Sequence, residues 1–335
     1  MWLRWAHLLL ALLPIHLIFG QINDIVRSKS NYKSTQTAFI PESLPSTACT
    51  SYKKSVFEEQ IGYSFLFPNA PVMYETIDNC LSYTPLIVGG QPADPKEFPH
   101  VARLGHRNER ERAKIEWFCG GTLISDRFVL TAAHCFESEQ GELNVVRLGD
   151  LDFENDQEDA SPRNYAVANY YRHPQFISPA LYNDIGMVKL AERVQFDRYK
   201  HPACLPFESG QNMPSFIAVG WGSTNFASKS SAKLLKVKLN YIADDVCRRV
   251  IGKSDDYPRG FEPATQMCVG SSRAMDTCSG DSGGPILVYH KEYPCMYHVM
   301  GITSAGIACG TPRIPSIYTR VYYYLDWITH IMANF

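Results

Sequence analysis

The decapeptide DTCSGDSGGP occupies residues 276–285, and three further motifs precede it: IVGG at 87–90, TAAHC at 131–135 and NDIGMVKL at 183–190. These motifs contain His134, Asp184 and Ser282 in that order along the chain. A serine hydroxyl is a weak nucleophile at neutral pH and needs a neighbouring base to take its proton. An imidazole can be that base because its ordinary pKa is about 6.5, and a carboxylate can hold it in the required tautomer. The combination predicts nucleophilic catalysis by Ser282.

Each of these three residues also has a structural explanation when it is taken alone. His134 is one of ten histidines, Asp184 could be a turn carboxylate, and Ser282 could be a loop hydroxyl. The complete motifs in this order favour the catalytic interpretation over all three structural ones.

The composition and patterning of the chain change at Ile87. Before it, residues 21–86 are polar and proline-rich, and we expect at most one short helix at 55–61. After it, short β-rich runs alternate with glycine and proline turns, at 118–124, 128–131, 145–148, 185–190, 216–219 and 286–289. Such runs predict an all-β barrel or sandwich. Helices are expected at 244–251 and at the C-terminus, where apolar residues recur at helical spacing at Val321, Leu325, Ile328 and Met332.

In combination, the motifs resemble those of the chymotrypsin-like, or trypsin-fold, serine proteases over residues 87–335. The resemblance implies an all-β fold of two packed six-stranded antiparallel β-barrels, with a C-terminal helix and an irregular N-terminal pro-segment. It implies a serine endopeptidase that requires no cofactor. It also implies that the backbone N–H groups of Gly280 and Ser282 form the oxyanion hole.

The same resemblance assigns a substrate pocket. Asp276 lies six residues before Ser282, at the floor of the primary pocket in this family, where a carboxylate would bind Arg or Lys. The pocket walls would include Ser304, Gly306 and Ser316. Relatives commonly have tryptophan where this chain has Ala305 and glycine at the Ser316 position, so we expect slower or narrower cleavage of small peptides than a digestive trypsin achieves.

Activation is implied by the IVGG motif, which resembles the new N-terminus of cleaved zymogens. The freed ammonium group of Ile87 would pair with Asp281 and order the pocket. Leu86 precedes the cut. A pocket with Asp276 at its floor should not accept leucine, so an upstream protease with an apolar primary pocket is expected to cleave there.

The N-terminus indicates the compartment. Residues 1–20 combine Arg4, an apolar run at 8–19 and Gly20, as a secretory signal peptide does. The run is shorter than the roughly 20 apolar residues that span a bilayer. We therefore expect a secreted protein with no membrane partner. The net charge of −2 argues against a nucleic acid partner.

The segment around Cys49 and Cys80 resembles the linker of invertebrate snake-type, clip-domain proteases of extracellular immune, melanisation and developmental cascades. The clip module needs six cysteines, and residues 21–86 contain two, so the clip domain is expected to be absent or degenerate. The resemblance implies a protease zymogen as protein substrate, a serpin-type inhibitor and a monomer. Two alternatives remain open: a digestive or broad-specificity trypsin-like enzyme, and a catalytically silent homologue that acts as a binding cofactor.

Ten cysteines suit a disulfide framework made in an oxidising compartment. The family resemblance implies four pairs: Cys119–Cys135, Cys247–Cys268, Cys278–Cys309 and Cys80–Cys204. Cys49 and Cys295 then remain, and we expect them to pair; two free or intermolecular thiols are the alternative.

Metal binding has little support in the sequence. The chain has no CxxC and no HExxH motif, so no zinc site is expected. An acidic run lies where some relatives bind Ca²⁺ through oxygen ligands: Asp150, Asp152, Glu154, Asp156, Glu158 and Asp159. We expect a solvated loop there in preference to a structural Ca²⁺ site near Asp150.

Overall fold

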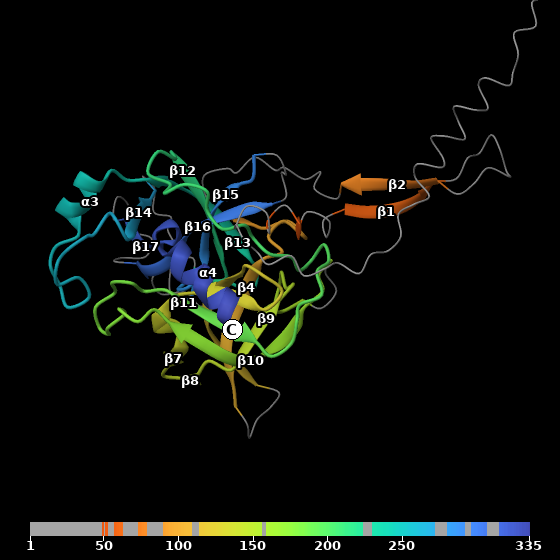
Figure 1. The fold of residues 1–335 in the computed structure, drawn as a ribbon, viewed down its shortest axis with the longest axis horizontal. Coiled ribbons are helices and arrows are strands. Elements are labelled where there is room, and N and C mark those ends of the chain that lie inside the picture. The colour runs from red at the N-terminus through yellow and green to blue at the C-terminus, as the bar shows by residue number, and fades with distance from the viewer. Residues whose placement is uncertain are drawn as a thin grey trace, which may run out of the picture. The chain divides into compact units, whose positions relative to one another are not determined.

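The structure is a computed structural model that describes residues 49, 51–52, 57–62, 73–78, 90–108, 114–155, 159–223, 230–271, 280–291, 296–306 and 315–335. Figure 1 shows that antiparallel strands dominate the described part of the chain. The expected signal peptide at 1–20 lies outside the described residues. Within the described residues, no helix is long and apolar enough to cross a membrane.

The first barrel is a closed ring of six strands in the order β10-β11-β6-β5-β4-β9. Their bounds are β4 Val101–Arg107, β5 Ile115–Leu123, β6 Phe128–Thr131, β9 Val145–Leu148, β10 Arg163–Arg172 and β11 Gly186–Leu190. Every residue of β6 is buried, which explains why its sequence, FVLT, is continuously apolar up to Thr131. A separate two-stranded sheet of β7, Glu137–Ser138, and β8, Gly141–Glu142, follows β6 in the chain.

The second barrel has strand order β12-β15-β16-β17-β14-β13, and pairing between β12 and β13 closes the ring. Its strands are β12 Ser215–Gly220, β13 Leu235–Tyr241, β14 Gln266–Gly270, β15 Pro285–Tyr289, β16 Tyr297–Gly306 and β17 Ser316–Arg320. The short strand β3, Gln91–Pro92, adds to the outer edge of β13. The expected pair of six-stranded antiparallel barrels is therefore confirmed.

The two barrels meet in a shared apolar core, and a second, smaller cluster lies among the strands of the second barrel. A single buried cluster includes Leu104 and Leu130 of the first barrel together with Leu287 and Val299 of the second. Residues far apart in the sequence therefore exclude water jointly, and this packing fixes the surface along which the barrels meet.

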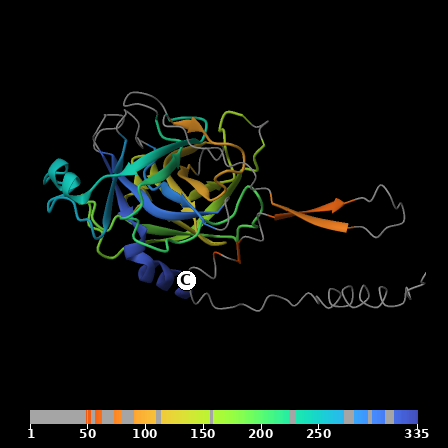
Figure 2. The ribbon, with the colours of Figure 1, turned by 90° about the horizontal axis from the view of Figure 1, so that it is seen from above.

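Helices complete the fold. The expected helix at 244–251 is confirmed as α3, Asp244–Val250, with acidic residues in its first turn and Arg248 and Arg249 in its last, as the helix dipole favours. The C-terminal helix is also confirmed: the 3₁₀ turn η3, Val321–Tyr324, leads into α4, Leu325–Asn334. Figure 2 shows α4 along the outside of the barrels, and its Ile328 and Ile331 are buried in the shared core.

The helix expected at 55–61 is wrong. Phe57–Gly62 forms the strand β1, which pairs antiparallel with β2, Met73–Asp78. A strand derives its stability from a partner distant in sequence, so local preference did not reveal it. The segment before Ile87 is therefore less irregular than expected.

The disulfides require two corrections. The pairs Cys119–Cys135 and Cys247–Cys268 are confirmed. Cys204, however, is bonded to Cys49, with a Cα–Cα distance of 5.1 Å that suits a disulfide. Because a sulfur forms only one such bond, the expected pairs Cys80–Cys204 and Cys49–Cys295 are both wrong.

The environment of Cys49 explains this pairing. Cys49, Cys204 and Met296 form one buried cluster, and Tyr52 packs against it. The ring of Tyr52 meets that of Phe196 edge to face at 5.5 Å between centroids. Apolar contacts therefore hold this part of the N-terminal segment beside Cys204. Cys80, Cys278, Cys295 and Cys309 lie outside the described residues.

Candidate active site

His134 lies in a short 3₁₀ turn that follows a buried strand of the first barrel. The fully buried strand β6 leads into the 3₁₀ turn η2, Ala133–Phe136, which contains the histidine. The next residue, Cys135, is bonded to Cys119 of β5, so the turn is covalently attached to the neighbouring strand. The histidine side chain itself retains 29% exposure and can meet a substrate.

Asp184 is the buried partner of this histidine. It follows Asn183, which has the left-handed φ of 54°, and it lies two residues before the start of β11 at Gly186. Its carboxylate is fully buried and accepts hydrogen bonds from the backbone N–H of His134 at 3.0 Å and from its Nδ1 at 2.8 Å. Both the position and the tautomer of the imidazole are therefore set by Asp184, with the proton on Nδ1 and a free lone pair on Nε2.

Ser282 lies in a tight turn before β15. Gly280 and Gly283 have φ of 98° and 78°, conformations that glycine adopts without a steric penalty. Backbone hydrogen bonds secure the turn on two sides: the N–H of Gly120 donates to the Ser282 carbonyl at 2.7 Å, and that of Gly283 to Thr303 at 2.8 Å. The serine is therefore held between strand β5 of the first barrel and β16 of the second.

The turn that contains Ser282 packs closely against the segment that contains His134. A Cβ on Gly283 would overlap Thr131 Oγ1 and the Gly120 carbonyl, and would lie 3.1 Å from Cys135 Sγ. Thr131 and Cys135, three residues before and one residue after His134, thus pack against Gly283, the residue that follows Ser282. The structure thus places His134, Asp184 and Ser282, from three separate motifs, in one region of the molecule, and their catalytic roles stay a prediction.

The electrostatics of the pair suit a base that works near neutral pH. Burial lowers the pKa of His134, whereas the charge of Asp184 and its hydrogen bond raise it, and the balance leaves this pKa above its ordinary value of 6.5. A more basic imidazole is a better acceptor for a hydroxyl proton. Asp184 thus both orients His134 and stabilises its protonated form.

The comparisons with known proteins agree with this geometry. A family model described as Trypsin matches residues 87–328. The chain belongs to the trypsin family. It is a trypsin-like serine endopeptidase whose two barrels have the fold expected of that family.

Several invertebrate proteases are similar to this chain. Serine protease snk of Drosophila melanogaster is 40% identical over 255 residues, which cover 75% of this chain and 58% of that protein. Venom protease of Bombus pensylvanicus is 34% identical over 247 residues, covering 72% of this chain and 96% of that protein. Phenoloxidase-activating factor 1 of Holotrichia diomphalia is 33% identical over 260 residues, covering 72% and 68%. The chain thus spans little more than half the length of snk.

Two residues of the trypsin-like site have contacts that the sequence did not reveal. Ser304, expected in the pocket wall, donates its hydroxyl to Asp184 Oδ2 at 2.5 Å. The hydroxyl of Thr319 donates to the Asp184 carbonyl at 2.7 Å. Both lie on strands of the second barrel, more than a hundred residues away in sequence, so no local pattern could have indicated them.

The pocket residues are described only in part. Gly306 of β16 pairs with Ser316 of β17, and Ser316 is buried at their junction. The expected floor residue, Asp276, lies outside the described residues. Among the residues expected to take part in activation, Asp281 is buried and accepts a hydrogen bond from the Gly222 N–H at 2.8 Å, whereas Leu86 and Ile87 lie outside the described part.

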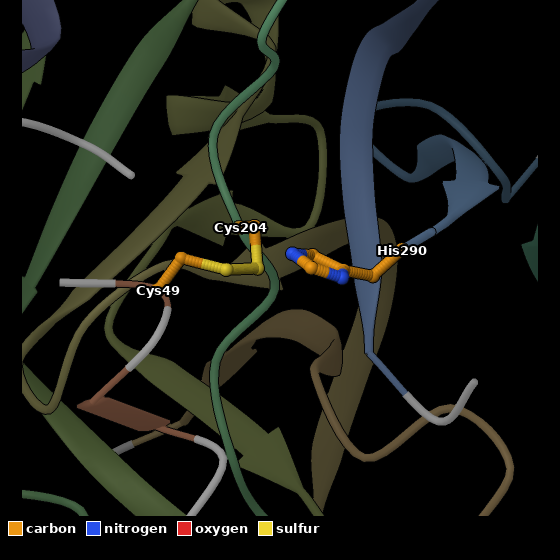
Figure 3. Close-up of side chains that lie close together, drawn as sticks. All are labelled: Cys49, Cys204 and His290. Carbon is orange, nitrogen blue, oxygen red and sulfur yellow. A yellow bond between two sulfur atoms is a disulfide. The ribbon is translucent and has the colours of Figure 1, made fainter. Parts of the chain in front are cut away.

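Two groups of potential metal ligands occur among the described residues. One contains Cys49, Cys204 and His290; the other contains Cys119, His134 and Cys135. Figure 3 shows the first, with the His290 imidazole facing the disulfide. The cysteines of both groups form disulfides and therefore offer no thiolate, which is the form that binds a metal. Neither group fits a metal site.

The described carboxylates of the acidic loop after β9 do not fit a Ca²⁺ site either. Asp150 pairs with Arg147 at 2.5 Å, Asp159 with Lys96 at 2.6 Å, and Asp152 approaches Lys233 at 4.0 Å. A Ca²⁺ site needs several oxygens that converge on one point. These described carboxylates instead turn toward separate cations, whereas Asp156 and Glu158 lie outside the described residues.

Proposed function

We propose that this chain is a secreted zymogen that is cleaved between Leu86 and Ile87 and then hydrolyses peptide bonds after Arg or Lys. The observation that carries the proposal is the hydrogen-bonded pair of His134 and buried Asp184, packed against the turn of Ser282. The signal-like residues 1–20 support secretion.

In this mechanism, His134 Nε2 takes the proton of the Ser282 hydroxyl as its oxygen attacks the scissile carbonyl. Asp184 keeps the proton of the neutral imidazole on Nδ1 and stabilises the cation that then forms. The imidazolium next gives its proton to the leaving amine, which produces the acyl-enzyme. Water, deprotonated by the same histidine, releases the acid and regenerates Ser282.

The tetrahedral intermediate needs donors for its negative oxygen. We assign this role to the backbone N–H groups of Gly280 and Ser282. Gly280 has a φ of 98°, at which a non-glycine residue would be strained, so the turn that presents these two N–H groups requires glycine there. Loss of one such donor typically reduces the rate by about 10²- to 10³-fold.

Specificity for Arg or Lys is assigned to Asp276. A carboxylate in a closed pocket binds a guanidinium or ammonium group through a charge-assisted hydrogen bond. Replacement by serine removes that charge, so Asp276→Ser should abolish cleavage after Arg. Retained preference for arginine in this variant would refute the pocket assignment.

Activation is assigned to an ion pair between the Ile87 ammonium group and Asp281. The burial of Asp281 against Gly220 and Gly222 supports it, because a buried carboxylate without a compensating charge is costly and a cation beside it offsets part of that cost. Asp281→Asn should remain inactive after cleavage at Leu86–Ile87. Full activity of the cleaved variant would remove this step of the proposal.

The substrate is proposed to be another protease zymogen in an extracellular immune, melanisation or developmental cascade. Support comes from the similarity to snk and to Phenoloxidase-activating factor 1. Leu86 before the cut favours a separate upstream activator with an apolar pocket over self-activation. A serpin-type inhibitor and a monomeric state complete the proposal.

One experiment separates this proposal from its rivals. The chain is cleaved at Leu86, its N-terminus at Ile87 is verified, and arginyl ester turnover and phosphonate labelling of Ser282 are measured with Ser282→Ala as control. Absence of both activities would indicate a silent homologue. Rapid cleavage of unrelated denatured proteins, with no preference among candidate zymogens, would indicate a digestive enzyme.

A further inference from the structure

The segment that follows the proposed cleavage site is bound to the second barrel. Strand β3 pairs with β13 in the register Gln91–Lys236 and Pro92–Leu235. The Ala93 N–H continues this attachment by donating to the Leu234 carbonyl at 2.8 Å. Of the residues after the cut, only 87–90 therefore precede a paired strand.

A buried charge cluster strengthens this attachment. Lys236 of β13 is 1% exposed, and its Nζ lies 2.8 and 2.6 Å from the two carboxylate oxygens of Glu97. It also lies 3.3 Å from Asp94 Oδ2. The backbone N–H of Asp94 donates to Glu97 Oε2 at 2.9 Å, so the carboxylate closes the loop onto the lysine.

Burying these charged groups costs desolvation free energy, so their contribution to the fold has to be identified. Burial raises the pKa of Glu97, against the opposing effects of the hydrogen bond and the charge of Lys236. A well-packed apolar pair commonly stabilises a fold as well as a buried ion pair does. The ion pair adds a defined position, because the three hydrogen bonds that Lys236 donates fix the loop 94–97 at one place on β13.

That place is adjacent to the carboxylate proposed to receive the new N-terminus. Leu235 pairs with Pro92 on one side and with Gly220 of β12 on the other, and Asp281 abuts Gly220. Two strand spacings separate Pro92 from Gly220, about 10 Å. Five residues, from Pro92 back to Ile87, can extend about 17 Å, so a chain anchored at Pro92 is long enough to reach Asp281 beside Gly220.

We propose that Lys236 is a positioning residue for activation: with Glu97 and Asp94 it anchors the segment after the cut, so that cleavage frees a short arm at the right distance from Asp281. This inference rests on the proposed pairing of Ile87 with Asp281. The anchor shifts the equilibrium of the cleaved enzyme toward the conformer with an ordered pocket. Only that conformer binds an arginine side chain.

The test is kinetic and separates positioning from stability. In Lys236→Met the loop loses its anchor, and the ordered fraction of the cleaved enzyme falls. Apparent affinity falls in proportion to that fraction, whereas bound substrate restores the ordered state. KM for an arginyl ester and Ki for a benzamidine-type pocket ligand should both rise by about tenfold, the effect of ordering roughly one residue of backbone, with kcat unchanged.

Two further variants control the experiment. Lys238 is an exposed lysine two residues along β13, and Lys238→Met should change neither constant. Glu97→Gln keeps the shape of its partner and should raise KM and Ki together by a smaller factor, so it decides the matter if Lys236→Met does not fold. A fall in kcat, or unchanged KM and Ki in folded variants, would overturn the inference. Cleaved wild-type protein that turns over no arginyl ester would overturn the proposed function instead, and this inference with it.

Discussion

Substitution of Asp184 by asparagine gives the sharpest test of the catalytic geometry. Within the described residues, the carboxylate accepts from the His134 N–H, from His134 Nδ1 and from the Ser304 hydroxyl. An amide of the same shape offers one acceptor oxygen and one NH₂ donor. Its oxygen must face the His134 N–H, because two donors cannot face each other there. The NH₂ group then faces Nδ1.

This orientation forces the wrong tautomer on His134. With Nδ1 an acceptor, the proton moves to Nε2, which can no longer take the proton of Ser282. We expect kcat of Asp184→Asn to fall about 10⁴-fold, equivalent to about 5 kcal/mol of activation free energy, with KM nearly unchanged. The fold should persist because the side-chain volume is retained.

The assay is arginyl ester hydrolysis by the cleaved enzyme as a function of pH. In the wild type, the acid limb of kcat/KM should lie above pH 6.5, because the pKa of His134 is raised and the base must be neutral to act. In Asp184→Asn this limb should move to lower pH, since the anion that raises the pKa is gone. Asp245→Asn, on the exposed face of α3, is the control. Residual activity within about tenfold of wild type would refute the assigned tautomer and with it the role of Asp184.

Three other outcomes are expected. Non-reducing peptide mapping should recover Cys49 joined to Cys204, and either cysteine with a different partner would contradict the structure. Buried His201, whose pKa is lowered to about 4 by burial, stays neutral in the fold while the unfolded chain binds a proton below pH 6.5. Stability should therefore fall by up to roughly 3 kcal/mol from pH 6.5 to pH 4, and His201→Gln should flatten this slope in thermal unfolding. Gly283→Ala should displace the Ser282 turn, because its Cβ would overlap Thr131 and Gly120, and should reduce kcat more than KM; unchanged kcat would contradict this packing.

Much of the fold was predictable because its signals are local. The runs at 128–131 and 145–148 became β6 and β9 with the expected bounds, since most of their residues are buried and of the aromatic or β-branched types that favour strands. The C-terminal helix followed from the helical spacing of Ile328 with its apolar neighbours. The segment at 55–61 shows the limit, because its strand depends on a partner in β2.

In the active site, too, some features follow from local sequence and others from contacts between residues distant in sequence. The sequence by itself determined which side chains are predicted to supply the nucleophile, the base and the orienting carboxylate, because the motifs around Ser282, His134 and Asp184 are contiguous and specific. Only the tertiary structure decided that Ser304 donates to Asp184, across 120 residues of chain, and that Cys204 bonds to Cys49. The physical reason is that residue type limits which chemistry is available, whereas a hydrogen bond or disulfide between distant residues forms only where packing of the two barrels and the N-terminal segment brings its atoms within reach.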